Sequence, residues 1–223
     1  MTYKVDIKIG ECKTLYDVKR FIELNKIKVI LFAETHGILN ELMIQNKIIY
    51  ELKPKCYIYE LLEEEQIISK TDFIKFLEKS DSERFSIISS FGELKPTVRL
   101  AKKYNLPLIG CDVRNMYRKN KDFLKEVNSS EEEQIMLKRE EKQIEVIKKS
   151  LIQYSAPIFV SVGAFHLRKD APIFKENGLN YIIIYPLINN VRLEDLQENF
   201  NINNIREVTY IIESSKNGAE NKN

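Results

Sequence analysis

The chain has 223 residues, of which 43% are hydrophobic and 30% are charged, and this balance excludes a chain that is disordered throughout. Lys and Arg number 35 and Asp and Glu 33, so the formal net charge of +2 gives no whole-chain indication of binding to nucleic acid or to an anionic membrane. With only 7 glycines and 6 prolines, the chain is neither collagen-like nor of low complexity.

The three cysteines, Cys12, Cys56 and Cys111, are far apart and form neither a CxxC pair nor a zinc-knuckle spacing. This distribution is typical of free thiols in a reducing compartment. The first residues, MTYKVDIKIG, contain no apolar signal-peptide segment, and no run approaches the roughly 18 apolar residues of a membrane span. We therefore expect a cytoplasmic protein that acts on neither membranes nor nucleic acid.

Helical patterns alternate with short β-rich runs along the chain. Thr14 followed by Asp17 predicts the capped start of a first helix, and Ser130 followed by Glu133 predicts another. Between these two starts, further apolar stripes predict helices over 39–52 and 94–104. The charge-dense KREEK segment at 138–142 is interpreted as the solvated face of the fourth helix. The predicted strands are 28–33, 56–60, 107–111, 158–163, 181–185 and 207–213.

Most of the predicted strands are continuous apolar runs, such as VILFA and YIIIY, rather than alternating patterns. Strands that are buried on both faces have this composition and belong to parallel sheets covered by helices. We therefore predict an α/β fold with an open, mainly parallel sheet of about six strands and helices on both faces. One domain is expected over 1–213, followed by a disordered polar tail at 214–223.

Polar residues follow the predicted strands at their carboxyl ends, where open parallel sheets bind ligands. The first strand leads into Glu34-Thr35-His36-Gly37, and the second ends in Glu60. The third and fourth lead into Cys111-Asp112-Val113-Arg114 and Gly163-Ala164-Phe165-His166. These four ends carry both histidines of the chain, together with three carboxylates and an arginine.

Side chains of these types have a shared chemical use. Histidine can act as a general base near neutral pH or bind a metal as neutral imidazole. Carboxylates can orient the imidazole, accept a proton or complete a metal site, and an arginine can stabilise an oxyanion. Each residue taken alone could instead be a helix cap or a structural histidine. Because both histidines follow core strands, we favour one shared polar site.

Other motifs are absent: the chain has no GxGxxG, Walker, GxSxG or HExxH sequence. Cys111 could be a thiol nucleophile, but a buried small hydrophobic residue is the more common reading of a cysteine at a strand end. Tyr117, three residues after Arg114, is a candidate wall residue or ligand of the site.

At these strand ends the sequence resembles the superfamily of erythromycin esterase-like, ChaN-like and TraB/TIKI-like proteins. ILFAETHGILNE resembles its first motif and YIYELLEEEQ its second, while AKKYNLPLIGCDVR and FVSVGAFHL resemble the third and last. The four motifs occur in family order over about residues 28 to 185. Ala33 stands where the first motif usually has glycine.

The resemblance implies a hydrolase in which His36 is the principal base or metal ligand. Glu34 and Glu60 would be its acidic partners, and His166 the second histidine. The esterase-like branch cleaves esters or lactones without metal, and the TIKI-like branch resembles metal-dependent peptidases. The ChaN-like branch resembles haem-binding proteins.

We thus expect a small-molecule or peptide carbonyl as substrate and Arg114 as the group that stabilises the anion. A divalent transition metal, if used, would be held by His36, His166, Glu60 and Asp112. The first alternative is a protein that binds haem or another anionic ligand without turnover, with Tyr117 as the cofactor contact. The second is a scaffold protein with a vestigial site.

Overall fold

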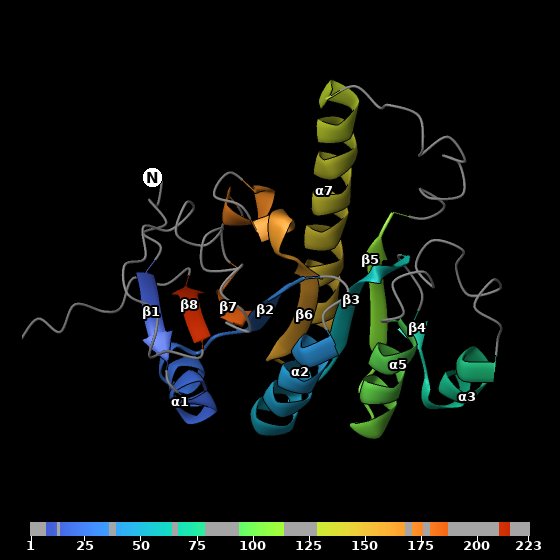
Figure 1. Ribbon diagram of the computed structural model, residues 1–223, viewed down its shortest axis with the longest axis horizontal. Helices are drawn as coiled ribbons and strands as arrows, with labels where there is room; N and C mark the ends of the chain where they lie inside the picture. The colour runs from blue at the N-terminus through green and yellow to red at the C-terminus, as the bar shows by residue number, and fades with distance from the viewer. Residues whose placement is uncertain are drawn as a thin grey trace, which may run out of the picture.

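A computed structural model of the chain describes residues 8–12, 14–35, 39–63, 67–78, 94–113, 129–167, 171–175, 179–186 and 210–214 (Figure 1). Within this part of the chain, one eight-stranded sheet has the order β1-β8-β7-β2-β6-β3-β5-β4. The single domain predicted over 1–213 stays a prediction, because 187–209 and other segments lie outside the described residues. The same holds for the predicted tail beyond Ser214.

Five neighbouring strands in the middle of this sheet are parallel, which confirms the α/β fold and the mainly parallel sheet. They are β2 (Val29–Glu34), β3 (Tyr57–Glu63), β5 (Leu108–Asp112), β6 (Ile158–Gly163) and β7 (Tyr181–Pro186). Every residue of β2, β3, β5 and β6 is buried, as continuous apolar runs predict for central strands.

Three antiparallel strands extend the sheet at its edges. They are β8 (Tyr210–Ser214), β1 (Lys8–Cys12) and the two-residue β4 (Ile67–Ile68). The described sheet therefore has eight strands rather than about six. Strand β1 was not predicted because KIGEC has little apolar character, and β4 was not predicted because two residues give no pattern.

Four helices lie where the sequence predicted them: α1 (Leu15–Asn25), α2 (Leu39–Leu52), α5 (Leu94–Lys103) and α7 (Ser129–Gln153). The structure adds α3 (Lys70–Glu78) and the 3-10 helices η2 (Ala164–Leu167) and η3 (Pro172–Lys175). Thr14 and Asp17 form the predicted capping box of α1. Helix α7 begins at Ser129, one residue before the predicted cap, and its first turns extend beyond the sheet (Figure 1).

Two apolar clusters, one on each face of the sheet, form the described core. On β2, Ile30 and Phe32 pack with residues of α1, α2 and α5, whereas the alternate residues Leu31 and Ala33 pack with residues of α7, η2 and η3. This alternation follows from the two-residue period of a strand. The predicted helices on both faces of the sheet are thus present, and each strand residue has a defined face.

Strands β3 and β5 approach each other unusually closely near their carboxyl ends. Their register shifts between Tyr59 and Glu63, as at a β-bulge. There, a Cβ added to Gly110 would lie 1.8 Å from the backbone oxygen of Glu63. Only glycine fits at this point, and Glu60 and Asp112 lie nearby, near the carboxyl ends of the two strands.

Candidate functional site

Glu60 and Asp112 lie near the carboxyl ends of β3 and β5 and are almost fully buried, at 2% and 0% exposure. Glu60 continues the alternation of Ile58, which packs in the α7-side cluster, so its carboxylate is directed to that face. Both strands extend further than the sequence predicted: Glu60, the predicted last residue of its strand, lies inside β3, and Asp112, which was predicted to follow its strand, is the last residue of β5. Two buried carboxylates at one sheet edge require cations nearby.

Arg139 of α7 supplies one of these cations. Its guanidinium donates from Nε to Asp112 Oδ1 at 2.9 Å and from Nη2 to Asp112 Oδ2 at 3.1 Å. The same Nη2 donates to Glu60 Oε1 at 2.8 Å. The side chain of Arg139 is only 15% exposed. A bidentate pair of this kind fixes both carboxylates relative to α7.

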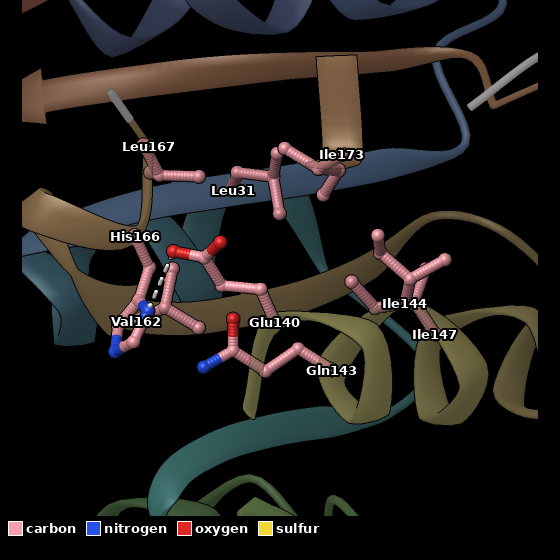
Figure 2. A pocket seen from close by; sticks show the side chains of 9 residues that line it. All are labelled: Leu31, Glu140, Gln143, Ile144, Ile147, Val162, His166, Leu167 and Ile173. Atoms are coloured by element: carbon pink, nitrogen blue, oxygen red, sulfur yellow. Dashed lines mark hydrogen bonds and ion pairs between the residues drawn. The ribbon is translucent and has the colours of Figure 1, made fainter. Parts of the chain in front are cut away.

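His166 in η2 supplies the second cation. Its Nε2 lies 2.9 Å from Glu60 Oε1, and its Nδ1 lies 3.2 Å from Glu140 Oε1 of α7, an interaction drawn in Figure 2. Burial by itself lowers the pKa of His166. The charge of Glu60 and the hydrogen bonds to Glu140 and Glu60 outweigh that effect and raise the pKa to about 9. At neutral pH His166 is therefore an imidazolium that donates from both nitrogens.

We call Glu60, Asp112, Arg139, Glu140 and His166 the charged cluster. Glu60 is its centre, because Oε1 accepts from both cations and Oε2 accepts from the backbone N–H of Gly163. Three carboxylates and two cations leave the cluster with one net negative charge. Three members of the charged cluster, Glu60, Asp112 and His166, were predicted to share one site, and the structure brings them together in this cluster.

Glu34 lies on the opposite face of the sheet, toward α2. Its carboxylate accepts from the Ser161 hydroxyl, from Gln45 Nε2 at 3.4 Å and from the Tyr59 hydroxyl at 3.4 Å. Gln45 in turn accepts from the Tyr57 hydroxyl at 2.5 Å. We call these five residues the Glu34 network. Sequence analysis treated Glu34 and Glu60 as acids of one site, whereas the structure directs them to different faces of the sheet.

Three predicted site residues, His36, Arg114 and Tyr117, lie outside the described residues. His36 follows Glu34 by two positions in the sequence, and Arg114 follows Asp112 by two. Their predicted roles as base, anion-stabilising group and cofactor contact stay predictions.

Three of the four predicted metal ligands, His166, Glu60 and Asp112, are engaged in ion pairs, and the fourth, His36, lies outside the described residues. Both nitrogens of His166 face carboxylates, and Asp112 is held by Arg139. Within the described ranges, no group of three or more His, Cys, Asp or Glu side chains is placed to hold a metal ion. Cys111 is buried, and burial, followed by the charges of Glu60 and Asp112, raises its thiol pKa. A thiol of this kind is a poor nucleophile.

Arg139 and Glu140 were missed, because the KREEK segment was interpreted as a solvated helix face. That interpretation was wrong for these two residues, which are inside the charged cluster. One signal could have identified Glu140. It lies four residues before Ile144, on the same stripe as Ile144 and Ile147, and both of these are buried. A charge on an apolar stripe needs a buried partner.

Comparison with known proteins adds little to this description. No helix in the described part of the chain combines the length and apolar character of a membrane span. A scan against family models finds no match, and neither does a search of curated proteins. The solved structure of the type III effector HopBA1 is similar to the chain with a TM-score of 0.47 and 11% sequence identity, over 73% of this chain and 77% of the effector.

Proposed function

We propose that the chain is a hydrolase in which His36 activates a water molecule that attacks an ester, lactone or peptide carbonyl. One observation supports this function: Glu60, Asp112 and His166, from three neighbouring strand ends, converge in the charged cluster. This cluster lies at the edge where open α/β sheets bind their ligands. A buried imidazole with a perturbed pKa is typical of such sites.

The contacts divide the roles among these residues. His166 is already protonated at neutral pH, and both carboxylate oxygens of Glu60 accept hydrogen bonds from their neighbours. Neither residue is therefore suited to remove a proton from water. We assign the general base to His36, the other histidine of the chain. The charged cluster acts as the electrostatic support of the site, and Arg114 stabilises the anion formed at the carbonyl.

The metal-free form of this mechanism is the one that we propose, because the two nitrogens of His166 and the carboxylate of Asp112 are engaged in ion pairs. Binding a metal would require these pairs to separate and leave Arg139 without its partners. The haem-binding alternative gains no support from His166 for the same reason. We place the activity in the cytoplasm, in line with the free thiols of Cys56 and Cys111.

A panel of ester, lactone and peptide substrates tests the proposal. His36→Gln should lower kcat/KM by about a hundredfold to ten-thousandfold, the usual contribution of a general base. The thermal midpoint and circular dichroism should stay unchanged. Lys47→Gln, on the exposed side of α2, is the matched control and should keep full activity. Full activity in His36→Gln would contradict the assignment of the base.

Metal dependence is tested on the same protein. Activity should survive EDTA, and elemental analysis of protein purified without chelator should find no stoichiometric transition metal. Activity that is lost in EDTA and restored by a divalent ion would overturn the metal-free form. If no substrate of the panel is turned over, the hydrolase proposal fails. A haem titration with a Soret shift that depends on Tyr117 would then support the ligand-binding alternative.

A further inference from the structure

A small cavity lies beside the charged cluster, between β2, β6, α7 and the two 3-10 helices. Its volume is about 10 Å³, which is close to the space that one buried water requires. Six of its nine lining side chains are aliphatic, and the other three are Glu140, Gln143 and His166 (Figure 2). The cavity is therefore mostly apolar, with three polar side chains in its wall.

Gln143 is the polar group that the charged cluster does not explain. It is 5% exposed, and its Nε2 has no hydrogen-bond partner in the part of the chain that the structure describes. It follows Glu140 by three residues on α7, so both side chains lie on one side of the helix. Figure 2 shows its amide on the same side of α7 as the Glu140 side chain and the His166 ring. A buried amide donor in aliphatic surroundings is destabilising unless it is hydrogen-bonded.

We propose that this cavity is a binding site for one ordered water molecule. The water accepts a hydrogen bond from Gln143 Nε2 and donates one to the carboxylate of Glu140, which also accepts from His166. It thereby links α7 to the charged cluster and holds the Glu140 carboxylate in the position that orients the His166 ring.

The chemistry of the walls favours water over other occupants. A wholly aliphatic cavity would stay dry, but two polar groups are enough to hold a water molecule. A metal cation would require several further oxygen ligands, which aliphatic walls do not provide. An organic ligand would not fit in the volume. This inference does not depend on the hydrolase proposal.

A crystal structure at a resolution that reveals ordered water tests the site. We expect, in the wild-type protein, an electron-density peak within hydrogen-bonding distance of both Gln143 Nε2 and Glu140. The peak should be lost in Gln143→Leu, which removes the amide and leaves a shorter, aliphatic side chain. Gln134→Leu, on the exposed part of α7, is the matched control and should keep the peak.

Three results would overturn the inference: an empty cavity in the wild-type protein, a peak that persists in Gln143→Leu, or a peak with the coordination of a metal cation. If Gln143→Leu does not fold, the wild-type crystal structure still decides between a bound water and an empty cavity. Magnetisation transfer from a long-lived water to nearby amide protons gives the same answer for the wild-type protein in solution.

Discussion

Loss of the His166 proton should make the protein less stable as the pH rises. Its pKa is about 9 in the folded protein against an ordinary value of 6.5, so the folded state binds the proton more tightly than the unfolded state does. The stabilisation is complete below about pH 6.5 and is lost as the pH rises through about 9. A difference of about 2.5 pKa units corresponds to about 3 kcal/mol at the acidic limit. Between about pH 7 and 8.5 the slope approaches about 1.4 kcal/mol per pH unit.

Urea unfolding at several pH values measures this slope. His36→Gln is the suitable background, because His166 is then the only imidazole in the chain. The free energy of unfolding should fall by about 1.5 kcal/mol between about pH 6.5 and 8. Measurements should stop near pH 8, because burial also raises the pKa values of Cys56 and Cys111. Their thiols ionise first in the unfolded state, which lowers stability at higher pH.

The matched comparison is the double variant His36→Gln/His166→Gln. It should be less stable at pH 6.5, because Glu60 and Glu140 lose their imidazolium partner. Its stability should also change little up to pH 8, so the two curves converge. An NMR titration of His36→Gln gives the pKa of His166 directly. Equal slopes in the two variants, or a titration midpoint near 6.5, would refute the imidazolium assignment.

Two further variants test the sheet edge. Arg139→Met should lower the free energy of unfolding in urea by about 3–5 kcal/mol, because it leaves the carboxylates of Glu60 and Asp112 buried without this cation. The control is Arg99→Met, on the exposed side of α5. Equal losses in the two variants would show that Arg139 contributes no more than a surface residue. Gly110→Ala should lower the free energy of unfolding by about 3 kcal/mol or more in the same assay, because the added Cβ would lie 1.8 Å from the backbone oxygen of Glu63. An unchanged urea midpoint would contradict the close approach of β3 and β5.

Much of the fold could be predicted because the central strands are buried on both faces. Continuous apolar runs such as VILFA and IFVSVG indicate such strands directly, and all five parallel strands were predicted to within a few residues. The exact strand ends could not be predicted, because charged residues usually end a buried strand: Glu34 and Asp112 were placed after their strands, and Glu60 was taken as the last residue of its strand. They are strand residues in the structure because hydrogen bonds and cations from other elements compensate their burial.

The composition of the site was predictable only in part. Glu60, Asp112 and His166 could be grouped, since carboxyl ends of neighbouring parallel strands meet at one edge. The order of the strands in the sheet, however, could not be predicted from the sequence, and neither could the face of the sheet to which each side chain points. Glu34 was therefore grouped with Glu60, although one faces α2 and the other α7. Arg139 was missed because its partners come from β3 and β5, which are distant in sequence.

The adjacent positions of Arg139 and Glu140 on α7 restrict how the length of this helix can vary. Arg139 binds the carboxylates of β3 and β5, and the next residue binds His166. An alanine inserted between Glu140 and Ile144 would turn these two residues by about 100° relative to the part of α7 that packs on the sheet. Both would then leave their partners in one step. Insertions and deletions should therefore be tolerated only before Arg139, where the helix extends beyond the sheet (Figure 1).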